Sequence, residues 1–94
     1  MIFEIMIDEE LRAYLEGIDP RMILFSNEDE AILGWTEVKQ SQTFVAVYSY
    51  DKLVENMMKR DGVSRAVAVE YVDFNIVGAY LGDHTPIIVN KFYG

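Results

Sequence analysis

The stretch AILGWTEVKQSQTFVAVY, residues 31–48, decides the fold predicted for this chain. It contains two runs rich in β-branched and aromatic residues, 31–38 and 43–48, separated by four polar residues. Such runs favour strands, and a short polar connection between them favours a β-hairpin. Gly34 interrupts the first run and indicates a bulge or a close approach of another segment. We therefore predict an antiparallel hairpin at the centre of the sheet.

A helix is predicted directly after the hairpin, over residues 51–60. Ser49 or Asp51 is placed to cap it, because a side-chain oxygen there accepts a hydrogen bond from an otherwise unpaired backbone N–H. The apolar residues of this segment recur at helical spacing on one face. Gly62 follows the segment and favours the end of the helix.

A second helix is predicted over residues 64–81, with Ser64 placed to cap it. At about 100° per residue, this helix is apolar nearly all round apart from Glu70 and Asp73. We expect it to be the central helix of the fold. We also expect it to pair antiparallel with the helix over 51–60, on one face of the sheet.

The N-terminal third completes the expected fold. An N-cap at Asp8 and apolar residues at helical spacing predict a helix over residues 8–16, and residues 1–7 are apolar enough for a short strand or lead-in. Short apolar runs at 22–25 and 86–90 are typical of strands. The predicted fold is α+β, a small antiparallel sheet with a central hairpin, covered by about three helices.

The size and composition of the chain indicate one small domain over residues 1–94, with no linker or repeat to divide it. A core of this size leaves a thin margin of stability, and the helix over 64–81 has more apolar surface than a thin sheet can cover, so we expect a homo-oligomer. The absence of cysteine excludes disulfides, thiolate zinc sites and cysteine nucleophiles. With no leader pattern and no apolar run of about 18 residues, we expect a cytoplasmic protein without a membrane span.

The charge of the chain is −8, and its N-terminal part carries that charge. Residues 1–38 hold ten acids and two bases, whereas residues 39–94 hold six of each. Direct nucleic-acid binding is therefore disfavoured, because it depends on Lys and Arg. We predict that two acidic clusters are exposed and form a negative surface for a protein partner, with solubility as the alternative role. These residues are Asp8, Glu9, Glu10, Glu28, Asp29 and Glu30.

No motif for a cofactor, a metal ion or catalysis stands out in the sequence. The acidic clusters lack the alternating ligands of a calcium loop, and phosphate-binding and acyl-transfer signatures are absent. His84 is the single histidine, and we interpret it and Thr85 as turn residues that bond the local backbone. We therefore expect no cofactor and no enzymatic activity.

Asn75 falls on the apolar side of the last predicted helix. Buried polar groups are usually hydrogen-bonded, so we expect a buried amide that bonds a neighbouring loop or strand and fixes how the helix docks. A ligand-binding amide is the alternative.

A resemblance adds a biological setting. The stretch EYVDFNIVGAYLGDHTPI at residues 70–87, with VYSYDKLVE at 47–55 and EAILGW at 30–35, resembles a set of small uncharacterised proteins encoded by bacteriophages and bacteria. The similarity covers residues 30–89 and brings no established activity with it. It implies a phage or prophage setting, in which small acidic proteins often act by binding host proteins.

Three classes of function follow from the sequence. The first is a protein-binding modulator that acts on a host protein, and the second is a structural or self-assembling protein. The third is a small-molecule binder or an enzyme of unrecognised type, which an enclosed polar pocket around Asn75, Tyr80 and His84 would favour.

Overall fold

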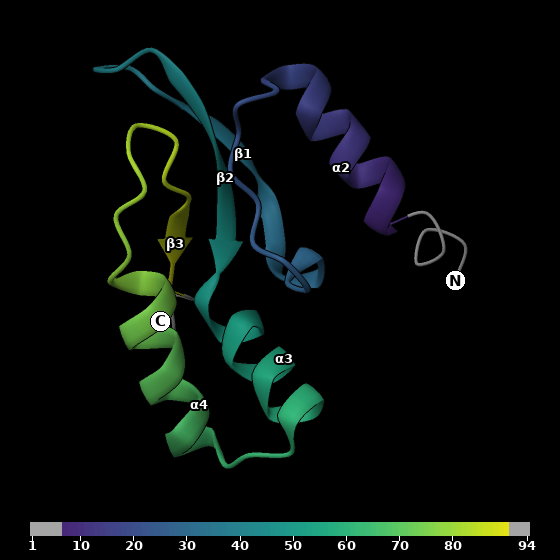
Figure 1. Ribbon diagram of the computed structural model, residues 1–94, viewed down its shortest axis with the longest axis vertical. Coiled ribbons are helices and arrows are strands. Elements are labelled where there is room, and N and C mark those ends of the chain that lie inside the picture. The colour runs from purple at the N-terminus through teal and green to yellow at the C-terminus, as the bar shows by residue number, and fades with distance from the viewer. Residues whose placement is uncertain (1–6, 91–94) are drawn as a thin grey trace.

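The computed structural model of the chain describes residues 7–90, and side chains from residue 9 onward (Figure 1). It is the predicted α+β fold, with three helices and a three-stranded sheet that contains the central hairpin. Apart from Ile7, the apolar stretch 1–7 lies outside the described residues. In chain order the elements are helix α2 (Ile7–Ile18), the short 3-10 helix η1 (Asp29–Ala31), strands β1 (Ile32–Val38) and β2 (Thr43–Ser49), helices α3 (Tyr50–Asp61) and α4 (Arg65–Val72), the π-helical turn η2 (Asp73–Val77) and strand β3 (Ile87–Val89).

The hairpin lies where the sequence predicts it. β1 and β2 pair antiparallel, and the connection closes with a 2.7 Å hydrogen bond from the Gln42 N–H to the Val38 carbonyl. The register shifts between Ile32 and Gly34, so one strand carries an extra residue at that point. The bulge indicated by Gly34 is therefore confirmed.

The sheet is mixed, so the prediction of an antiparallel sheet is wrong for its third strand. β3 lies beside β2 and runs parallel to it, with Ile87 opposite Val47 and Val89 opposite Ser49 (Figure 1). Parallel neighbours require a long crossover connection, and the helices between β2 and β3 provide it. The strand order is β1-β2-β3.

Residues 22–25, predicted as a strand, form none. Side chains from other elements form hydrogen bonds with the backbone of this segment instead. The Phe25 N–H donates to the Tyr48 hydroxyl at 2.8 Å, and the Phe25 carbonyl accepts from Arg12 at 2.9 Å. The apolar side chains of this segment still pack against the core, with the Phe25 and Tyr48 ring centroids 5.0 Å apart.

The two helices after the hairpin are capped where the sequence predicts. The Ser49 hydroxyl accepts from the Lys52 N–H, and α3 ends at Gly62 with a left-handed φ of 65°. The Ser64 hydroxyl accepts a hydrogen bond from the Val67 N–H at 3.3 Å and so caps the start of α4. α3 and α4 form the expected antiparallel pair (Figure 1). The pair extends past the end of the sheet at which β2 finishes, and does not lie across one of its faces (Figure 1).

The helix predicted over residues 64–81 is shorter in the structure. α4 passes into the π-helical turn η2, which ends at Val77. The Gly78 N–H bonds the Asp73 carbonyl, five residues earlier, at 3.1 Å. A Cβ at position 78 would lie 3.3 Å from that carbonyl, so glycine suits this close approach. Residues 78–86 then form a loop that leads to β3.

The core forms where β2 meets α3 and α4. Tyr48 is fully buried in it, and burial raises the pKa of its hydroxyl to about 12, so the group stays protonated and neutral. The other buried members of this cluster are Ala31, Ala46, Leu53, Val54, Met57, Ala68, Val72 and Ile76.

We expect Tyr48→Phe to lower the free energy of unfolding by about 1 to 3 kcal/mol, because it removes the acceptor of the Phe25 N–H and leaves that amide without a partner. Urea denaturation would measure the change. Tyr14→Phe is the matched control, since its hydroxyl contacts Trp35 at 3.4 Å on the exposed surface and its loss should cost less than about 0.5 kcal/mol. Equal effects at the two positions would contradict a structural role for the Tyr48 hydroxyl.

Candidate protein-binding surface

A concentration of exposed apolar side chains lies along α4, η2 and the start of the loop that follows. Phe74 is 81% exposed and Tyr80 is 80% exposed, which are unusual values for large aromatic residues. We call this feature the α4–η2 surface, and it comprises Val67, Tyr71, Phe74, Val77, Tyr80 and Leu81.

The α4–η2 surface exists because the helix is apolar on two sides. Ala68 and Val72 face α3 and the core, where they are buried. Val67, Tyr71 and Phe74 are spaced by four and three residues, so they share a second side, which is exposed. α4 lies at the outside of the molecule with α3 along one flank (Figure 1). The expectation that this helix is central is therefore wrong, although its predicted excess of apolar surface is real.

Acidic residues border this surface. Glu70 is exposed, and it lies one helical turn from both Val67 and Phe74. Asp73 is also exposed, and its carboxylate accepts a hydrogen bond from the Tyr50 hydroxyl at 2.8 Å. Burial and this bond to an anion both raise the pKa of Tyr50. The surface therefore combines apolar contact area with negative charge.

The first acidic cluster lies at the start of α2. Glu9 and Glu10 are exposed there, as predicted, while the side chain of Asp8 lies outside the described part of the chain. This cluster therefore remains available for a partner.

The second acidic cluster is largely buried, contrary to prediction. Glu28 is 5% exposed and Asp29 is 8% exposed, whereas Glu30 is exposed. Asp29 takes two hydrogen bonds from Arg12, at 2.8 and 2.7 Å, and Glu28 pairs with Arg60 at 3.2 Å. Carboxylates leave water when an arginine compensates the loss of hydration, and these two arginines do so from α2 and α3. Glu28 and Asp29 are therefore structural residues.

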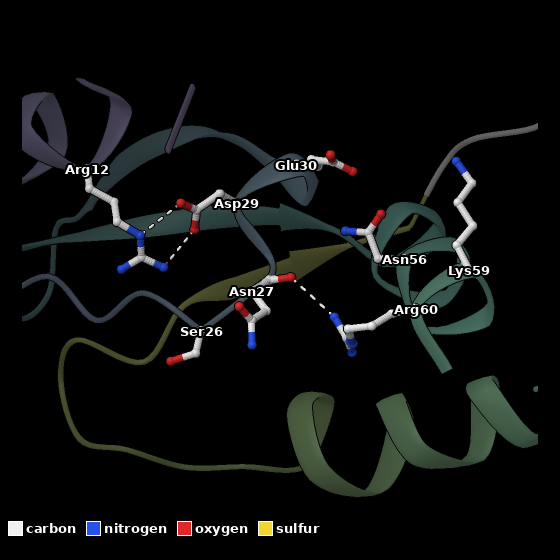
Figure 2. Close-up of a pocket in the computed structure, with 8 residues that line it drawn as sticks. All are labelled: Arg12, Ser26, Asn27, Asp29, Glu30, Asn56, Lys59 and Arg60. Carbon is white, nitrogen blue, oxygen red and sulfur yellow. Dashed lines mark hydrogen bonds and ion pairs between the residues drawn. The ribbon is translucent and has the colours of Figure 1, made fainter. Parts of the chain in front are cut away.

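A polar hollow of about 700 Å³ lies beside these ion pairs (Figure 2). Arg12 and Asp29 border one side of it and Arg60 borders the other, with Asn27 between them (Figure 2). Arg60 also donates to the Asn27 carbonyl at 3.2 Å, and Asn27 adopts a left-handed φ of 64°. Asp29 and Glu28 neutralise these two arginines. We therefore interpret the hollow as the place where α2, the turn before η1, and α3 meet, and not as a binding site.

The predicted structural polar residues have different outcomes. Ser64 caps α4, as described above. The Thr85 hydroxyl donates to the Gly82 carbonyl and accepts from the Leu81 N–H, both at 2.7 Å, and so fixes its turn as expected. Asn75 is exposed and donates to the Tyr71 carbonyl one turn earlier, at 3.1 Å. The prediction of a buried, docking Asn75 is wrong, because its amide bonds its own helix.

His84, predicted to bond the local backbone, instead joins the C-terminal loop to the residue that follows α2. Its Nε2 lies 3.3 Å from a carboxylate oxygen of Asp19, which is 4% exposed. The Arg21 N–H and guanidinium also bind this carboxylate, at 2.9 and 3.2 Å. The backbone and side-chain bonds from Arg21, together with the contact to His84, lower the pKa of Asp19 to about 2. We interpret the set as a link that holds two distant segments together.

Comparisons with protein-family models, with curated proteins and with solved structures gave no match to this chain. Within residues 7–90, no three His, Asp or Glu side chains converge to hold a metal ion. None of the helices in that range is long and apolar enough to cross a membrane.

A small-molecule binder would need an enclosed polar pocket around Asn75, Tyr80 and His84. Asn75 and Tyr80 are both exposed, so neither lies in such a pocket. The α4–η2 surface is therefore the leading candidate site.

We expect Asp29→Asn to lower the free energy of unfolding by about 1 to 3 kcal/mol, because it removes the charge of a buried carboxylate that binds an arginine in a bidentate pair. Thermal or urea denaturation would measure this loss. Glu30→Gln makes the same kind of change one residue away, at an exposed side chain, and should change stability by less than about 0.5 kcal/mol. Two equal, small effects would mean that the buried pair contributes little.

The free energy of unfolding should fall with acid in a window set by Asp19. Its folded pKa of about 2 lies below the ordinary value of 3.8, so its stabilising contribution is complete above the ordinary value and is lost as pH falls through about 2. Urea denaturation between pH 5 and pH 2 should therefore show a shallower loss in Asp19→Asn than in the wild type. Parallel pH profiles for the two proteins would contradict this role.

Proposed function

We propose that this chain is a small protein-binding module without an enzymatic role, and that it docks on its partner through the α4–η2 surface. The exposure of Phe74 and Tyr80 is the observation that carries the proposal. Aromatic residues are enriched at protein–protein interfaces, and clustered exposed apolar residues mark such sites. Burying these side chains in a partner would remove their contact with water.

The acidic character of the chain supports a role in choosing the partner. Glu9, Glu10 and Glu30 are exposed, and the chain carries a net charge of −8. Such charge speeds the encounter with positively charged surfaces, and this attraction weakens as the salt concentration rises. The resemblance of residues 30–89 to small phage and bacterial proteins supports a bacterial host protein as the partner, bound in the cytoplasm.

Self-association is a second candidate, because the same apolar surface and the small size of the chain favour a homo-oligomer. Light scattering coupled to size exclusion separates the two proposals. A mass near 10.8 kDa at micromolar concentration supports a module for another protein, and a larger mass supports assembly.

The proposal is tested with tagged protein as bait in a bacterial lysate, comparing the wild type with the double variant Phe74→Ser/Tyr80→Ser. We expect the double variant to lose the proteins that the wild type retains, because its apolar anchors are gone while its exposed positions leave the core intact. Leu33→Ser is the matched control, since Leu33 is 61% exposed but lies on β1. Retention that survives the double substitution would exclude this surface.

A further inference from the structure

We propose that the α4–η2 surface binds a cationic amphipathic helix, whose apolar stripe packs on the exposed aromatic residues and whose arginine or lysine side chains meet Glu70. This inference rests on the proposed function and adds the chemistry of the partner. The charges on and around the surface carry it.

The surface has the spacing that helix-on-helix packing requires. Val67, Tyr71 and Phe74 form a row along α4 at steps of four and three residues. Side chains in such rows pack between the rows of a second helix. The aromatic rings of this row supply the contact area that anchors most such interfaces.

The surface carries negative charge that its own chain does not neutralise. Residues 66–90 contain three acids and neither lysine nor arginine. Glu70 forms no ion pair within the described residues 7–90. Arg65, the nearest base in the sequence, approaches Asp51 of α3 at 3.9 Å. A cation brought by a partner would therefore meet an uncompensated carboxylate.

The backbone adds to this field. Helical backbone dipoles place partial negative charge at the C-terminal end of a helix, where cations are stabilised. The helical segment formed by α4 and η2 ends at Val77, between the exposed aromatic residues Phe74 and Tyr80. Glu70 and the helix end therefore favour the same sign of charge in the partner.

Arginine suits this surface better than lysine. Its planar guanidinium stacks on an aromatic ring while its N–H groups bind a carboxylate in pairs. Phe74 lies one helical turn beyond Glu70, so its ring and the carboxylate are neighbours on the helix surface. We therefore expect arginine to be preferred at the position opposite Glu70.

The same charges disfavour a second copy as the occupant. A twofold interface places identical surfaces against each other, so the acids of one copy would face those of the other. Like charges brought together at an interface oppose association, and each copy carries a net charge of −8. A basic partner removes this repulsion and gains attraction in its place.

The test uses the full chain and two labelled synthetic helical peptides of about 16 residues that share one leucine stripe, one with flanking arginines and one with flanking glutamates. Fluorescence anisotropy at low salt should show binding of the arginine peptide alone. We expect Glu70→Gln to weaken this binding by up to about fivefold, the upper limit for one exposed ion pair, and Phe74→Ser to weaken it at least about tenfold. Glu70→Arg should exchange the preference, so that the glutamate peptide now binds better.

Matched variants separate the site from the net charge. Glu16→Gln makes the same change of charge at an exposed position of α2 and should leave binding of the arginine peptide unchanged. If Glu16→Gln weakens binding as much as Glu70→Gln does, the attraction is non-specific and the inference fails. If both peptides bind equally and both need Phe74, the surface is a docking site but the charge inference is wrong. If neither peptide binds, or if Phe74→Ser has no effect, the proposed docking function of the surface fails as well.

Discussion

Two consecutive carboxylates, Glu28 and Asp29, are removed from solvent, and an arginine from a different helix holds each of them. Arg12 of α2 binds Asp29 in a bidentate arrangement and also binds the Phe25 carbonyl, while Arg60 at the end of α3 binds Glu28. One turn of the chain is therefore fixed to both helices. Because an unpaired buried carboxylate is costly, the positions of α2 and α3 depend on each other through this turn. The Tyr48 hydroxyl accepts a hydrogen bond from the N–H of Phe25, three residues before Glu28, and so attaches this segment to the sheet.

The arrangement of the helices explains the free apolar surface of α4. One side of α4 packs against α3, and the pair projects past the end of the sheet, so no other described element covers its opposite side (Figure 1). The exposed Phe74 and Tyr80 contribute nothing to the core, which Tyr48, Leu53 and Val72 fill. Selection for stability alone gives no reason to keep large aromatic residues there. A binding role gives that reason, because contact with a partner would bury them.

Local features were readable from the sequence, and features that depend on distant partners were not. The hairpin, its bulge and the Ser64 cap follow from residues close together in the chain. The burial of Glu28 and Asp29 depends on arginines 32 and 17 residues away, which a charge pattern does not reveal. Asn75 was misplaced for a different reason: it lies beside Tyr71, and the sequence does not show that this side of the helix stays exposed. The excess of apolar surface in the last helix was predictable, but the side that would stay exposed depends on how α3 packs.

The parallel pairing of β3 with β2 has a consequence for how the chain reaches its fold. The β1–β2 hairpin and the α3–α4 pair join neighbouring segments and close short loops, so they can form early. β3 joins the sheet only after residues 50–86 have folded back, which is a non-local and slower step. Until then, the three residues of β2 that β3 pairs with, Val47–Ser49, have no partner on that edge. An unpaired edge of such β-forming residues recruits strands from other molecules, so the period before β3 docks is when this chain is most prone to aggregate.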